Sequence, residues 1–139
     1  MKPSHIEHIG IAVANLEAAI SFYEKVLGLT CYNVEEITDQ KVRTAFFMVG
    51  QTKIELLQST DPEGPIGKFI AKKGEGIHHI AFSVEKIEEQ LVHAAKQGIA
   101  LIDSKPRKGA EGLDIAFLHP KSTSGVLIEL CEKKSEPLK

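Results

Sequence analysis

The stretch IHHIAFSV at residues 77–84 repeats the pattern of the stretch IEHIGIAV at residues 6–13. His79 in the second stretch corresponds to His8 in the first, an offset of 71 residues (79 − 8 = 71), about half of the 139-residue chain. The same offset pairs Ala45-Phe46 with Ala116-Phe117. The chain is therefore expected to be a tandem duplication of one folding unit.

Glutamates repeat in the same way, further along each half. Ile54-Glu55-Leu56 corresponds to Ile128-Glu129-Leu130 after three extra residues in the second copy shift the offset to 74 (129 − 55 = 74). Each half thus supplies one strand histidine and one strand glutamate. Because a duplicated fold can bring corresponding positions to its pseudo-two-fold axis, these four side chains are expected to converge.

The apolar periodicity predicts the same order of elements in both halves. Strands are expected at residues 5–13, 29–37, 42–49 and 52–59, and again at 77–84, 99–103, 112–119 and 125–132. Helices are expected from the Asn15 cap to Gly28 and over residues 86–97. The prediction is an α+β protein of two tandem βαβββ modules, at about 5–59 and 76–132. The linker, 60–75, carries a short helix near 66–73, and residues 133–139 resemble a frayed tail. About 60 residues bury little surface, so we expect one domain over residues 1–139.

Composition favours a small cytoplasmic enzyme. Hydrophobic content is 42%, charged content is 26% and net charge is −2, values that give no global attraction to nucleic acid or membrane. No stretch has the roughly 20 apolar residues of a membrane helix. Cys31 and Cys131 have no metal-type spacing and are expected to be reduced thiols.

The two strand glutamates are chemically unusual. Glu55 and Glu129 both lie between apolar neighbours, and an ionised carboxylate is costly to bury without a partner. A single strand histidine or glutamate is usually structural or solvated, but four in repeat-related positions favour a divalent metal site with neutral histidines in its shell. His78 is expected to face away from His79 and not to be a ligand.

The paired modules with His8, Glu55, His79 and Glu129 resemble the vicinal oxygen chelate superfamily, which includes glyoxalase I, extradiol dioxygenases and bleomycin-resistance proteins. The likeness covers nearly the whole chain and implies a curved mixed sheet around a central metal site. Within the superfamily, the segments FLHPK at residues 117–121 and GVLIEL at 125–130 are similar to the methylmalonyl-CoA epimerase family. They are the specific signal, since the glyoxalase segment usually has an Asn-Pro-Asp-Gly type turn.

The resemblance implies metal-dependent interconversion of (R)- and (S)-methylmalonyl-CoA through a metal-stabilised enolate. It implies a cobalt, manganese, nickel or zinc ion held by His8, Glu55, His79 and Glu129. Inversion needs a base on each face of the enolate, and Glu129 is expected to be one. Some epimerases carry a glutamate where this chain has Thr44 and a glutamine where it has Glu55, so Glu55 is the candidate for the second base.

The expected partner is an acyl-CoA, and the expected assembly is a homodimer. Lys121, Arg107 and Ser122 are candidate contacts to the CoA phosphates, the alternative being solvated loop residues. Two other functions stay open: a glyoxalase I (lactoylglutathione lyase), which shares the four-ligand shell, and a metal-free binding protein of the antibiotic-resistance kind. An extradiol dioxygenase is disfavoured because its iron has three protein ligands.

Overall fold

The computed structural model describes residues 1–133, and the expected tail beyond Lys133 lies outside that range. The predicted α+β fold is confirmed, with the order βαβββ occurring twice along the chain. The described residues form two compact units, one of His8–His79 and one of Met1–Glu7 with the chain from Ile80 onward. Each unit is described by itself.

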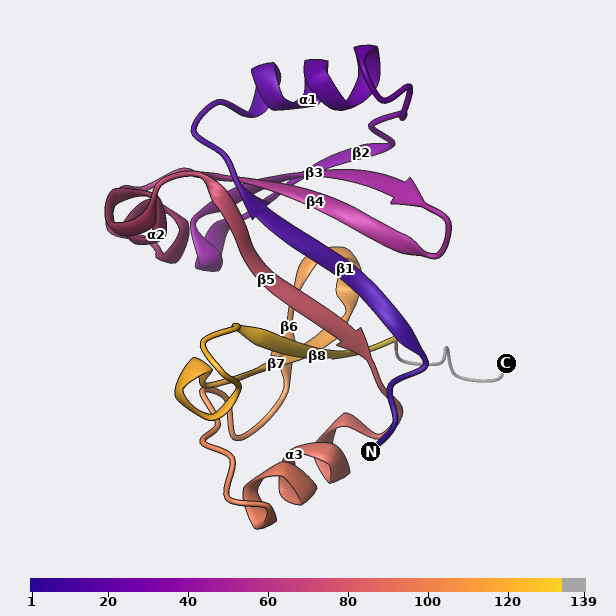
Figure 1. The fold of residues 1–139 in the computed structure, drawn as a ribbon, viewed down its shortest axis with the longest axis vertical. Helices are drawn as coiled ribbons and strands as arrows, with labels where there is room; N and C mark the ends of the chain where they lie inside the picture. Colours follow the sequence, from indigo (N-terminus) through magenta and orange to yellow (C-terminus); the bar gives the residue numbers. More distant parts are fainter. Residues whose placement is uncertain (134–139) are drawn as a thin grey trace. The chain divides into compact units, whose positions relative to one another are not determined.

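The His8–His79 unit is built on a four-stranded sheet. Its elements are β1 (His5–Ala12), α1 (Leu16–Lys25), β2 (Asn33–Ile37), the short 3-10 helix η1 (Thr38–Gln40), β3 (Val42–Val49), β4 (Thr52–Ser59) and α2 (Pro65–Lys73). The strand order is β2-β3-β4-β1 (Figure 1). Strands β2, β3 and β4 are antiparallel, and β1 runs parallel to β4 with Gly10 opposite Glu55.

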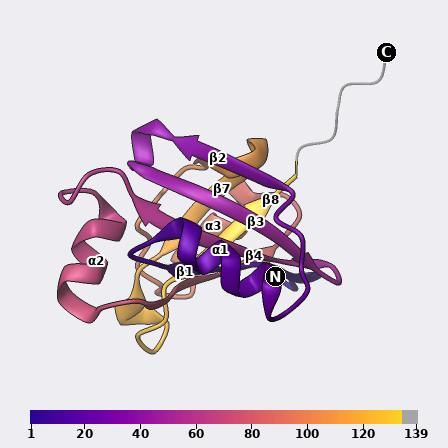
Figure 2. The same cartoon turned by 90° about the horizontal axis from the view of Figure 1, so that it is seen from above.

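The two faces of this sheet have different tasks. Helix α1 packs through Leu16 on a core that includes Phe47 and Leu56. On the other face, α2 packs through Ile66 against Ala12 and Leu57, and it lies at one end of the strands, away from α1 (Figure 2). Because strand side chains alternate, His8, Gly10 and Glu55 belong to the face opposite α1. The contacts of α2 on that face are with Ala12 and Leu57, at one end of the strands.

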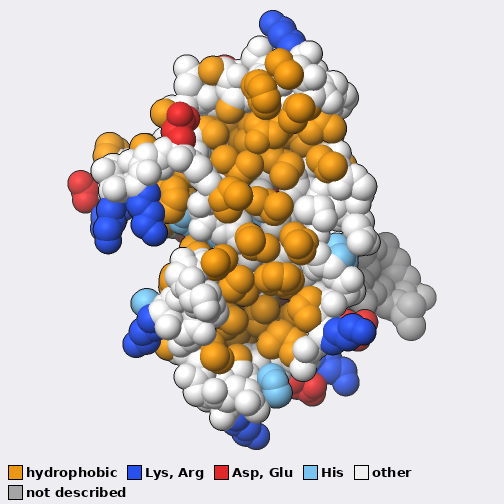
Figure 3. Space-filling view, in the orientation of Figure 1, with side chains coloured by type: hydrophobic (Ala, Val, Ile, Leu, Met, Phe, Trp, Pro, Cys, Tyr) orange, Lys and Arg blue, Asp and Glu red, His pale blue; other side chains and the backbone are white. Residues whose placement is uncertain are grey.

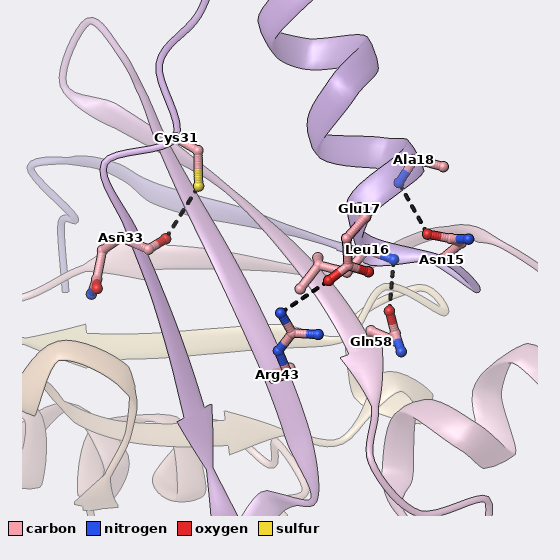
Figure 4. Close-up of polar contacts among 8 residues, drawn as sticks. All are labelled: Asn15, Leu16, Glu17, Ala18, Cys31, Asn33, Arg43 and Gln58. Atoms are coloured by element: carbon pink, nitrogen blue, oxygen red, sulfur yellow. Dashed lines mark hydrogen bonds and ion pairs between the residues drawn. The ribbon is translucent and has the colours of Figure 1, made fainter.

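Helix α1 is fixed to the sheet at its N-terminus (Figure 4). The Asn15 side chain accepts the Ala18 N–H at 3.0 Å, as the predicted cap requires. The Gln58 Oε1 atom accepts the Leu16 N–H at 2.6 Å, and Arg43 pairs with Glu17 at 3.1 Å. A helix cap of this kind contributes about 1 kcal/mol.

The second unit repeats this plan. Its elements are β5 (Gly76–Ser83), α3 (Ile87–Lys96), β6 (Arg107–Lys108), η2 (Ala110–Gly112), β7 (Asp114–Leu118), η3 (Pro120–Ser122) and β8 (Ile128–Glu132). The order is β5-β8-β7-β6, with β5 parallel to β8. Helix α3 packs through Ile87 and Leu91 on Ala116 and Leu130.

The helix tether is duplicated as well. Glu132, three residues after Glu129, accepts the backbone N–H groups of Lys86 and Ile87 at 2.6 and 3.1 Å. Gln58 stands three residues after Glu55 and does the same for α1. The two tethers are 74 residues apart (132 − 58 = 74), the same offset as the two glutamates.

The prediction of a strand at residues 99–103 was wrong. Only Leu101 makes a bridge, to Leu118, and the short β6 pairs with β7 instead. The reason is local: the N–H groups of Ile102 and Asp103 both donate to the Phe117 carbonyl, and the Asp103 carboxylate accepts the Phe117 N–H at 2.9 Å. The backbone therefore leaves the ladder before Pro106, which has no N–H to offer. Strand β2 also begins at Asn33, later than the expected residue 29.

The surface keeps several large apolar side chains in contact with solvent. Phe22, Val26 and Leu27, in α1 and the turn that follows it, are about half to two-thirds exposed. Hydrophobic side chains also cover much of the face over β3, β4 and β1 (Figure 3). No helix among residues 1–133 is long and apolar enough to cross a membrane.

Candidate metal centre

His8 is a buried side chain of β1, and its ring is held by a carboxylate from the neighbouring strand. Its Nδ1 atom lies 3.2 Å from Oε2 of Glu55, and both side chains are about 95% removed from solvent. A carboxylate at one ring nitrogen orients an imidazole and raises its basicity at the other. The sequence prediction that these two residues converge is thus confirmed within this unit.

His79, on β5, meets His8 at the other ring nitrogen. The two Nε2 atoms are 3.0 Å apart, and the rings meet edge to face with centroids 5.1 Å apart. Two ring nitrogens this close together in a buried place could both bind one divalent ion. Two imidazole nitrogens beside a buried carboxylate are also donors that suit a divalent transition metal. The residues present fit such an ion.

Gly10 makes room for the His79 ring. A Cβ atom at position 10 would stand 2.5 Å from Nδ1 and 2.8 Å from Nε2 of His79, distances that real Cβ atoms do not show. The His79 imidazole therefore packs directly on the backbone of β1 at Gly10. Glycine in a strand interior is otherwise unfavourable, and the close approach of the ring accounts for it.

We expect Gly10→Ala to weaken metal binding, because its methyl group must displace His79 from His8. Gly67→Ala is the matched control, since a Cβ there would stand 2.6 Å from the Pro62 carbonyl, where α2 meets the linker. Both variants should unfold at a lower temperature than the wild type. Only Gly10→Ala should lower the zinc affinity of the folded protein, as measured by competition with a chromophoric chelator. Equal zinc affinity in the two variants would contradict the role given to Gly10.

His78 was expected to face away from His79 and not to be a ligand. Its ring nevertheless contacts that of its neighbour, with the two Nδ1 atoms 3.0 Å apart. The ring is half-buried and rests edge-on against Phe69, with centroids 5.0 Å apart. Burial, reinforced by the charge of Lys73, lowers the pKa of His78 to about 4. The ring is therefore neutral at pH 7. Alternation along the strand gave no signal for this contact.

Glu129 belongs to the other unit, in the middle of β8. It is 3% exposed and stands in register with Ala81 of β5 and Phe117 of β7. Its burial agrees with the sequence argument that this carboxylate needs a cation or a donor. Its role as a metal ligand stays a prediction.

Thr44 is fully buried on β3. Its neighbour two residues along the strand, Phe46, is the register partner of Glu55, so Thr44 shares the face of Glu55. Its hydroxyl has no hydrogen-bond partner within residues 1–133. A hydroxyl cannot act as the general base that a carboxylate would be at this place.

The three candidate CoA contacts belong to short elements of the second unit. Arg107 is in β6, and Lys121 and Ser122 are in η3. The Arg107 Nε lies 3.2 Å from Asp103, and its guanidinium stacks over Phe117. The Ser122 oxygen accepts the Ala100 N–H at 2.9 Å, which leaves its own proton to donate. Lys121 is exposed in η3. Arg107 is thus held in place by its own unit.

The order βαβββ, present twice, and the two paired histidines define the class of protein to which the chain belongs. Comparison with known proteins gives the same answer: residues 7–117 match the model of the Glyoxalase/Bleomycin resistance protein/Dioxygenase superfamily, and the chain belongs to that superfamily.

Three similar proteins locate the chain more finely. YqjC of Bacillus subtilis, an uncharacterized protein, is 47% identical over 96% of this chain and 95% of its own. The mitochondrial methylmalonyl-CoA epimerase of Mus musculus is 36% identical over 93% of this chain and 73% of its own. A variant of the Streptomyces coelicolor methylmalonyl-CoA epimerase, solved in complex with 2-nitronate-propionyl-CoA, has 34% identity and a TM-score of 0.92 over 96% of this chain and 97% of its own. With such relatives, this chain is an isomerase of the epimerase type.

Proposed function

We propose that this protein epimerises methylmalonyl-CoA at C2 with the help of a divalent metal ion. The observation that carries the proposal is the His8–His79 contact, in which two buried ring nitrogens face each other at 3.0 Å beside Glu55. The similarity to named methylmalonyl-CoA epimerases supports the substrate. The proposed protein ligands are His8, Glu55, His79 and Glu129, with cobalt, manganese, nickel or zinc as the ion.

Glu129 is included because the duplication makes it the counterpart of Glu55. Strand alternation supports the choice: His79 and Ala81 share one face of β5, and Ala81 is the register partner of Glu129 in β8. When bound, a divalent ion supplies Lewis-acid stabilisation of the negative charge that develops as the C2 proton leaves.

The proton steps fall to the carboxylates of the chain. Inversion requires that one group remove the proton from one face of C2 and that another return a proton to the opposite face. We propose Glu129 for one face and Glu55 for the other. In the structure Glu55 is held against His8, so its orientation is fixed before substrate arrives.

The acyl carrier is proposed to be coenzyme A, with its phosphates at Lys121, Arg107 and Ser122. The charges of Lys121 and Arg107 and the available Ser122 proton suit phosphate oxygens. We also propose a homodimer, which the exposed apolar side chains of α1 support.

The test is deuterium incorporation. Metal-loaded protein in deuterium oxide should place deuterium at C2 of methylmalonyl-CoA while the enantiomers interconvert, followed by mass spectrometry and chiral analysis. The same preparation should leave the glutathione hemithioacetal of methylglyoxal unchanged. Turnover of the hemithioacetal without exchange at C2 would instead assign the protein to glyoxalase I.

A further inference from the structure

We propose that His78 is a positioning residue for the metal centre. Its Nδ1 atom accepts the Nδ1–H of His79, which keeps His79 in the tautomer that offers Nε2 to the ion. This inference rests on the proposed metal site and assigns a role to a residue outside the proposed ligand set.

The carboxylate of Glu55 decides which ring nitrogen of His8 carries the hydrogen. An ionised carboxylate only accepts hydrogen bonds, so its contact with His8 at 3.2 Å requires the hydrogen of His8 to be on Nδ1. The Nε2 atom of a neutral His8 then carries no hydrogen. Its lone pair faces Nε2 of His79 at 3.0 Å.

Two nitrogens at that separation need a proton or a cation between them. When a cation takes that place, both Nε2 atoms are bare and His79 must carry its hydrogen on Nδ1. That hydrogen needs an acceptor, because the side chain is only 6% exposed. The Nδ1 atom of His78, 3.0 Å from Nδ1 of His79, is in position to accept it.

The surroundings of His78 suit it to this task. The ring is packed against Phe69, whose face also lies 5.8 Å from the Lys73 ammonium. This packing against Phe69 holds the ring in the orientation that brings its Nδ1 atom to Nδ1 of His79. The Nδ1 atoms of the two histidine ligands thus have different partners, a carboxylate oxygen for His8 and an imidazole nitrogen for His79.

The experiment compares three variants. His78→Leu removes the acceptor but keeps an apolar contact with Phe69, and it should lower zinc affinity about 10- to 100-fold, the usual cost of losing an outer partner of a ligand. His78→Asn should restore most of the affinity, because its side-chain oxygen can accept at nearly the place of Nδ1. His93→Asn, at an exposed position of α3, is the control and should bind zinc as the wild type does. Circular dichroism establishes that each variant is folded.

A second measurement reads the protons directly. Nitrogen-15 NMR of the zinc-loaded wild-type protein should show hydrogen on Nδ1 of His79 and none on Nδ1 of His78. Hydrogen on Nδ1 of His78 in that state, or wild-type zinc affinity in His78→Leu, would overturn the proposal. Zinc binding with the expected tautomers but no exchange of methylmalonyl-CoA would overturn the proposed reaction and leave this inference standing. Failure of the wild-type protein to bind zinc would overturn both.

Discussion

Replacement of His79 by alanine is expected to abolish tight metal binding and epimerase activity together. The side chain is buried, faces the ring nitrogen of His8 at 3.0 Å and fills the space above Gly10. Removing a ligand should reduce metal affinity by more than the roughly 10- to 100-fold expected for an outer partner. Activity should fall at least as far, because the remaining side chains cannot hold the ion at the place where charge develops.

The measurement is metal content by mass spectrometry after dialysis, alongside the rate of deuterium exchange. The fold should survive, since the substitution leaves the cores under α1 and α3 untouched, and circular dichroism checks this. His93→Ala serves as the control for loss of a histidine. Stoichiometric metal in folded His79→Ala protein would show that the ion lies elsewhere.

Replacement of Glu129 by glutamine is expected to cause the largest loss of proton exchange among the carboxylate variants. A neutral amide cannot accept the C2 proton, and general base catalysis typically contributes about 10²- to 10⁴-fold. That factor corresponds to about 2.7–5.4 kcal/mol of transition-state stabilisation. Deuterium incorporation at C2, measured at saturating metal, gives the loss directly, and metal content of the same sample separates it from loss of the ion.

Glu55→Gln is the matched comparison. The amide oxygen of glutamine can still accept from Nδ1 of His8, so metal should remain bound. Exchange lost with metal retained would assign Glu55 to proton transfer. Racemisation that continues in this variant would make Glu55 an orienting group or ligand only, and a metal-loaded Glu129→Gln protein with wild-type exchange would remove Glu129 from the proton steps.

Much of this architecture was predictable because the same alternation of apolar and polar residues occurs in both halves of the chain. The offsets between His8 and His79 and between Glu55 and Glu129 revealed two modules, and β3 and β4 begin and end at the expected residues. The helices were found from their spacing and from the Asn15 cap. These signals are local, and the sheet reinforces rather than overrides them.

What escaped prediction depends on contacts distant in sequence or on side-chain rotation. The sequence predicted a strand at 99–103 and did not predict β6. The reason is that the Asp103 carboxylate accepts the Phe117 N–H of β7. The role of Gly10 follows from a ring 69 residues further along the chain (79 − 10 = 69). The contact between His78 and His79 defied simple alternation, because two imidazoles on adjacent residues can turn toward each other although their Cβ atoms point apart.

Gln58 and Glu132, which hold the starts of α1 and α3, each follow a glutamate of the candidate site by three residues. This spacing restricts where residues can be inserted or deleted. Glu55 and Gln58, like Glu129 and Glu132, stand on opposite faces of one strand, so each strand is fastened on both sides. Adding or deleting one residue between the members of a pair would turn a carboxylate away from its face or detach a helix end. The connection between β7 and β8 carries no such pair of residues. The three extra residues of the second copy lie there, because the offset between the copies is still 71 at Phe117 and has become 74 at Ile128. Changes in length are therefore expected in connections of this kind, outside the strands that are attached on both faces.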